Sequence, residues 1–270
     1  MKISQRLYGK AQRGFTLVEL SIVLAVIGLI IGAIAIGKDV QRNAEYAKVK
    51  NKFVDQWEMA YNQYYQRTGV VVGDSQTQPR LMVNGANYAF VAGSPVSGGD
   101  MSKVTTPPAR VCDKADGDKM ATTDRDSTTL TDLREKMSRT GIRLPPGRAE
   151  GFEDRYVYLD TNGNPQEVQV CFQWNKPGTP AGSGNVMIIS GLTPDLARML
   201  DQMIDGKPDA REGRFRMQGV EQGTPNGPGI EWVGNNTQTI TSAMPKNNEL
   251  GAQHDEAQVE TVVAIYKMNQ

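Results

Sequence analysis

The chain has 270 residues but little of the residue types that catalytic and metal centres need. It contains one histidine, His254, and two cysteines, Cys112 and Cys171. A zinc centre or a Ser-His-Asp triad needs further ligands or catalytic residues around the histidine, and His254 lies in a polar stretch without them. The sequence also lacks a glycine-rich phosphate loop followed by lysine, and a His-Glu-x-x-His pair. These absences predict that the protein is not an enzyme.

Net charge is absent as well, because 30 basic residues balance 30 acidic ones. Such a balance argues against nucleic acid as a partner, since bulk binding to phosphates needs an excess of positive charge. A small basic cluster surrounds Phe215 and consists of Arg211, Arg214 and Arg216. It could contact DNA phosphates, but the favoured alternative is one face of a solvated strand.

Charge is scarcest near the N-terminus. Residues 15–37 form a run of 23 residues with one charged side chain, Glu19. As a helix this run would be about 34 Å long, enough to cross a bilayer core. The segment before it carries no acid and four bases, namely Lys2, Arg6, Lys10 and Arg13. By the positive-inside rule, the rest of the chain lies on the far side of the membrane.

The string Arg13-Gly14-Phe15-Thr16-Leu17-Val18-Glu19-Leu20 resembles the class III signal of type IV pilins and pseudopilins. The resemblance implies cleavage after Gly14 by a prepilin peptidase and N-methylation of Phe15. Glu19 would be the fifth mature residue, the acid that acts in assembly. Implied partners are other pilin subunits and an inner-membrane assembly platform. The alternative is a plain signal anchor with a stray glutamate.

The position of the cleavage site agrees with this resemblance. An ordinary secretory signal is cut after its apolar region, whereas Gly14 precedes it. Cleavage there keeps the anchor and creates an ammonium group on Phe15. A carboxylate deep in a membrane helix costs about 2.5–3.5 kcal/mol on insertion scales. Pairing between Glu19 and the Phe15 ammonium of a neighbouring subunit would offset this cost.

The helix is predicted to continue beyond the membrane as an amphipathic segment, residues 38–68. Its apolar positions recur every three or four residues, at Val40, Ala44, Ala47, Phe53, Trp57, Tyr61 and Tyr64. Thr68-Gly69 is the expected end, because glycine readily adopts the left-handed conformation of a helix C-cap.

Residues 69–270 read as a globular region with long loops. Strands are predicted at 156–159 and 167–172, around an Asn162-Gly163 turn, and at 186–190, 230–233, 237–242 and 259–268. A helix should start at Pro194, with Thr193 as its N-cap. The predicted fold class is α+β, a long N-terminal helix packed on an antiparallel sheet. The predicted divisions are a leader (1–14), a membrane helix (15–37), its amphipathic continuation (38–68) and the globular region (69–270).

Two further features of the globular region concern its stability. In the oxidising periplasm, Cys112 and Cys171 are expected to form a disulfide. The bond would close a loop of about 60 residues and contribute roughly 4 kcal/mol. The alternative is two buried free thiols.

Asp160, Asn162 and Asn164 resemble the first three ligands of a calcium loop. The EF-hand pattern would continue with glycine and glutamate where this chain has Pro165 and Cys171. The alternative is a hairpin turn that uses these residues for backbone reasons. We therefore expect no cofactor, with calcium at this loop as the one candidate.

The functional expectation is a structural subunit of a type IV pilus or of a related secretion filament. Major pilins often carry proline at the twenty-second mature position, where this chain has Ile36. Its size and this difference favour a minor subunit. The precursor is expected in the bacterial inner membrane with its globular region in the periplasm, and the assembled filament in the periplasm or outside the cell. The rival hypothesis is a membrane-anchored receptor for cell adhesion or DNA binding.

Overall fold

The computed structural model describes residues 15–88, 101, 104–111, 133–220, 229–232 and 260–269. The chain divides into two compact units, Met1–Asn43 and Ala44–Gln270. We call the second unit the head. Where described, the first unit consists of Phe15, Thr16 and most of helix α1, Leu17–Val49.

The helix continues into the head through a short π-helical segment, Lys50–Val54, and then through α2, Asp55–Thr68. Gly69 ends it with a φ of 75°, and its N–H donates to the Tyr65 carbonyl oxygen at 2.8 Å. The expected end at Thr68-Gly69 is therefore confirmed. The π-helical turn was not expected, because hydrophobic spacing does not reveal a single wider turn.

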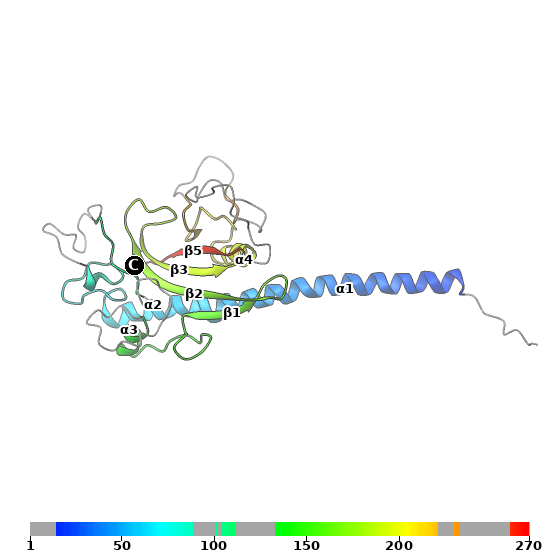
Figure 1. The fold of residues 1–270 in the computed structure, drawn as a ribbon, viewed down its shortest axis with the longest axis horizontal. Helices are drawn as coiled ribbons and strands as arrows, with labels where there is room; N and C mark the ends of the chain where they lie inside the picture. The colour runs from blue at the N-terminus through cyan, green and yellow to red at the C-terminus, as the bar shows by residue number, and fades with distance from the viewer. Residues whose placement is uncertain are drawn as a thin grey trace, which may run out of the picture. The chain divides into compact units, whose positions relative to one another are not determined.

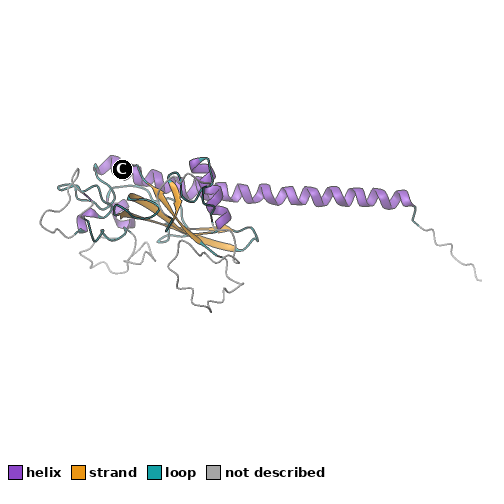
Figure 2. Cartoon of the chain, turned by 90° about the horizontal axis from the view of Figure 1, so that it is seen from above, coloured by secondary structure: helices purple, strands orange, loops and turns teal. Residues whose placement is uncertain are grey.

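The head contains a five-stranded sheet whose neighbouring strands are all antiparallel (Figure 1). In spatial order its strands are β1 (Arg155–Leu159), β2 (Pro165–Asn175), β3 (Gly184–Leu192), β5 (Val262–Lys267) and β4 (Phe215–Met217). Helices and strands together confirm the α+β class (Figure 2).

Aromatic rings join the helix to the sheet within the head. The ring centroids of Phe53 and Tyr156 lie 5.5 Å apart, and those of Tyr61 and Phe172 lie 4.9 Å apart. Trp57 also packs against Phe172, and its indole N–H donates to a backbone carbonyl at 3.2 Å. The predicted aromatic stripe is thus buried in the core. Val40, the first of the apolar positions expected to face the core, is 63% exposed and does not belong to it.

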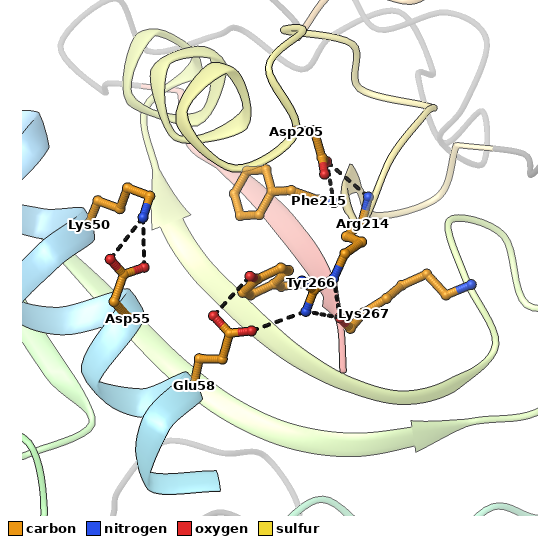
Figure 3. A network of polar contacts seen from close by, with 8 residues as sticks. All are labelled: Lys50, Asp55, Glu58, Asp205, Arg214, Phe215, Tyr266 and Lys267. Carbon is orange, nitrogen blue, oxygen red and sulfur yellow. Dashed lines mark hydrogen bonds and ion pairs between the residues drawn. The ribbon is translucent and has the colours of Figure 1, made fainter. Parts of the chain in front are cut away.

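Polar contacts fix α2 to the far strands of the sheet (Figure 3). Arg214 donates from Nη2 to Glu58 Oε1 at 3.0 Å, and the Tyr266 hydroxyl donates to Glu58 Oε2 at 3.0 Å. The Arg214 guanidinium also lies 4.9 Å from the centroid of the Tyr266 ring. Glu58 therefore connects the helix to both β4 and β5.

Two more α-helices complete the described part of the head, α3 (Leu133–Arg139) and α4 (Pro194–Asp205). Thr193 caps α4 as expected, accepting the N–H of Leu196 at 3.4 Å. The chain after α4 then covers the outer edge of β4. The N–H of Phe215 donates to Asp205 Oδ2 at 2.8 Å, and that of Met217 to the Ala210 carbonyl at 2.8 Å.

Candidate functional site

The candidate site is the start of α1, where Phe15, Thr16 and Glu19 lie within one turn. Thr16 donates to Glu19 Oε2 from its backbone N–H at 2.9 Å and from its hydroxyl at 2.9 Å. In return, the Glu19 N–H donates to Thr16 Oγ1 at 3.2 Å. Gly14, the other predicted site residue, lies outside the described residues.

This reciprocal arrangement is a capping box. The first N–H groups of a helix have no partner within the helix, and here the side chains of Thr16 and Glu19 satisfy two of them. A carboxylate at this end also interacts favourably with the helix dipole. Thr16 caps the helix, a role that the sequence analysis did not predict, although the Thr-x-x-Glu spacing could have revealed it.

The helix beyond the capping box exposes apolar side chains on every side. Leu17, Val18, Ile22 and Val23, which are spread around the helix axis, are all more than half exposed. Within the described part of the chain, one helix is long and apolar enough to cross a membrane, with a mean hydropathy of 2.8 over its best window. A helix whose described surface is apolar all round fits a membrane-anchored precursor.

A family model described as the prokaryotic N-terminal methylation motif matches residues 9–35. The matched range contains Gly14, Phe15 and Glu19 together with the first half of α1. Together with the apolar helix, this match supports a pilin-like or pseudopilin-like N-terminus. The chain is a precursor of the kind that prepilin peptidase processes. No curated protein and no solved structure matches the chain.

Of the two cysteines in the predicted disulfide, Cys112 lies outside the described residues. Cys171 lies in β2 and is 5% exposed. The neighbouring residue Phe172 pairs with Val111 in an antiparallel bridge, with the Val111 N–H donating to its carbonyl at 3.0 Å. This bridge is the last described pairing before Cys112, and the disulfide stays a prediction.

The candidate calcium residues lie in the turn between β1 and β2. Asp160 Oδ1 accepts the N–H groups of Asn162 at 2.9 Å and Asn164 at 2.8 Å. Its Oδ2 accepts from Gln166 Nε2 at 3.2 Å. Within the described ranges, no group of three acidic, histidine or cysteine side chains is placed to hold a metal. The geometry favours the hairpin-turn alternative, and calcium stays an untested prediction.

Arg214 and Arg216 lie on either side of the buried Phe215 at strand β4, whereas Arg211 lies in the loop before the strand. Phe215 is buried, and Arg214 is engaged by Glu58 and by the Tyr266 ring. Arg216 donates from Nε to the Gly213 carbonyl oxygen at 2.7 Å. The contacts with Glu58 and Tyr266 give Arg214 a structural role. His254 lies outside the described residues.

Proposed function

We propose that this protein is a structural, non-catalytic subunit of a type IV pilus-like filament, present there as a minor pilin or pseudopilin. The observation that carries the proposal is the methylation motif at the start of an apolar helix that its own chain leaves exposed. In this proposal prepilin peptidase cuts after Gly14, Phe15 is methylated, and α1 packs with the helices of other subunits on an inner-membrane assembly platform. Neither a cofactor nor nucleic acid is required.

The capping box gives Glu19 a role before assembly. Its hydrogen bonds hold the carboxylate at the start of α1 against Thr16, the residue that follows Phe15. Cleavage after Gly14 would place an ammonium group on Phe15, and an ammonium attracts a carboxylate strongly in apolar surroundings. We propose that the Phe15 ammonium of an adjacent subunit pairs with Glu19 in the filament and sets the axial register.

The head is proposed to lie in the periplasm and, after assembly, in a periplasmic or extracellular filament. This location is oxidising, and it agrees with the proposed disulfide between Cys112 and Cys171. The rival function, a membrane-anchored adhesin or DNA receptor, needs the helix only as an anchor. It would therefore need neither processing at Gly14 nor a carboxylate at Glu19.

The test is the mass of the intact protein extracted from membranes and from sheared filaments. We expect loss of residues 1–14 and one added methyl group on Phe15. A Gly14→Leu variant should remain uncut, whereas Gly9→Leu, in the same leader, should be processed normally. Mature protein that still begins at Met1 would exclude the pilin function.

A further inference from the structure

A carboxylic acid with an unusual environment lies inside the head, far along the chain from the N-terminal motif. Asp201, in the middle of α4, has no exposed surface. Its Oδ2 accepts the indole N–H of Trp232 at 2.7 Å. Its Oδ1 is also buried, and among the described residues it has no hydrogen bond of regular geometry.

The groups around Asp201 do not favour its ionised form. Burial raises the pKa of Asp201 to about 7, and the neighbouring carboxylate of Asp205 adds to the shift. The Trp232 indole and the backbone N–H of Asp209 oppose it in part. Asp205 itself is engaged, because its Oδ2 accepts the N–H of Arg214 at 2.9 Å.

Most described cations of the elements around Asp201 have other partners, and among the described residues no ion pair joins Arg211 to Asp201. Arg198 pairs with Asp195, and Lys207 pairs with Asp209 and Glu212. On the strands that α4 contacts, Arg214 pairs with Glu58, Arg216 donates to a backbone carbonyl, and the Tyr266 hydroxyl donates to Glu58. Lys267 of β5 has a lowered pKa because of burial and the nearby Arg216. No ion pair to Asp201 exists among the described residues to stabilise a charge there.

Trp232 belongs to a short segment, residues 229–232, that packs against α4 and the loop after it. Its ring is buried and lies 5.4 Å from that of Phe215. Ile230 donates its N–H to Asp209 Oδ1 at 3.3 Å, and its carbonyl accepts the N–H of Ala210 at 2.8 Å. Gly229 packs so closely on the Asp209 carboxylate that a Cβ would overlap it.

We propose that Asp201 and Trp232 form a pH-sensitive latch that holds residues 229–232 against α4. In the closed state Asp201 carries a proton and accepts the indole N–H through Oδ2. When Asp201 loses this proton to solvent, an unpaired charge remains in the interior beside a second carboxylate. Local opening then admits water to the charge, because hydration is far more favourable than burial.

The direction of the pH effect follows from proton linkage. The open, hydrated aspartate loses its proton near pH 4, whereas the closed one keeps it until about pH 7. Opening therefore becomes easier as the pH rises from about 4 to about 7 and levels off above that. The latch does not depend on the proposed filament role, because all its residues lie in the head.

The test is hydrogen exchange of the full chain in detergent micelles, followed by mass spectrometry of peptides that cover residues 229–232. Exchange rates are corrected for the intrinsic effect of pH on amide exchange. We expect protection of the wild-type segment to fall at least about tenfold from pH 5 to pH 8 and to level off near pH 7. Asp201→Asn, which keeps an acceptor for the indole but cannot ionise, should stay protected throughout.

Two other variants distinguish the latch from general effects of pH. Asp154→Asn removes a different buried acid, on the β1 side of the head, and should leave the loss of protection unchanged. Asp205→Asn removes the neighbouring charge and should shift the levelling-off to lower pH. Constant wild-type protection from pH 5 to pH 8 would overturn the proposal without any variant. The same loss of protection in a folded Asp201→Asn variant would overturn it as well.

Discussion

The first unit and the head differ in where their side chains find partners. In the described part of Met1–Asn43, large apolar residues are exposed, and the polar contacts are local ones such as that between Thr16 and Glu19. In the head, aromatic and charged side chains contact residues up to two hundred positions away, as Glu58 and Tyr266 do. Side chains in the described part of the head thus contact distant residues of the same chain, whereas the contacts described in the first unit are local.

The largest expected effect concerns the first unit. Glu19→Gln keeps the shape of the side chain and removes the charge that would pair with a Phe15 ammonium. We expect the variant to be inserted and cleaved but to enter sheared filaments at least about tenfold less than wild type, since a buried ion pair loses one partner. The measurement is the ratio of filament protein to membrane protein.

Thr16 supplies a matched pair for this comparison. Thr16→Ser keeps a hydroxyl that can cap the helix and should assemble as wild type does, whereas Thr16→Val removes it and should reduce assembly modestly. Normal incorporation of Glu19→Gln would show that this carboxylate does not direct assembly, and would favour the anchored-receptor function.

The next effect concerns the head alone. Cys171→Ser removes the proposed disulfide and should lower the free energy of unfolding by about 2–5 kcal/mol. Reduction of the wild-type protein should give a similar loss, measured by urea denaturation. If thiol-reactive reagents add mass to the unfolded wild-type protein without reductant, the two cysteines are not bonded.

A smaller effect is expected at the contact between α2 and the sheet. Glu58→Ala leaves Arg214 and the Tyr266 hydroxyl without their shared acceptor and should destabilise the head by about 1–3 kcal/mol. Glu150→Ala is the control, because the Glu150 side chain is 90% exposed in its ion pair with Arg134. Its effect should stay within about 0.5 kcal/mol. Equal effects of the two substitutions would mean that the Glu58 contacts add no net stability.

The smallest effect depends on pH. Burial raises the pKa of Asp154 to about 6, although Gln169 donates to its Oδ2 at 2.7 Å. The folded protein therefore keeps a proton that the unfolded chain loses, and stability falls as the pH rises from about 4 to about 6. Asp154→Asn should raise stability at pH 7 by about 1–2 kcal/mol and change it little at pH 4. A variant less stable than wild type at pH 7 would contradict this.

The sequence predicts the regular parts of the head well, and the reasons are local. The β1–β2 hairpin follows from alternating apolar residues around Asn162-Gly163, and α4 follows from Thr193-Pro194. A strand around Phe215 was expected only as the favoured alternative for the basic cluster, because three residues carry little pattern of their own, and pairing with β5 defines β4. The prediction of a strand at 230–233 was wrong for residues 230–232, which form no strand. Tertiary contacts with Asp209 and Asp201 decide their conformation.

The candidate site was predicted in its residues but not in its geometry. Phe15 and Glu19 follow from the motif, which the match to residues 9–35 supports. The capping role of Thr16 was not predicted. A single charge in an apolar run suggests a partner on another molecule, but Glu19 has one three residues away. The latch residues could not be predicted, since Asp201 and Trp232 are 31 positions apart and meet only in the folded head.

The covered edge of β4 has a consequence for protein crowding. An open sheet edge invites pairing with strands of other molecules, which leads to aggregation. Here Asp205 and Ala210 already accept the outward N–H groups of Phe215 and Met217. Identical heads at high local density therefore cannot extend one another's sheets at this edge. The segment that follows α4 therefore prevents a neighbouring molecule from adding a strand next to β4.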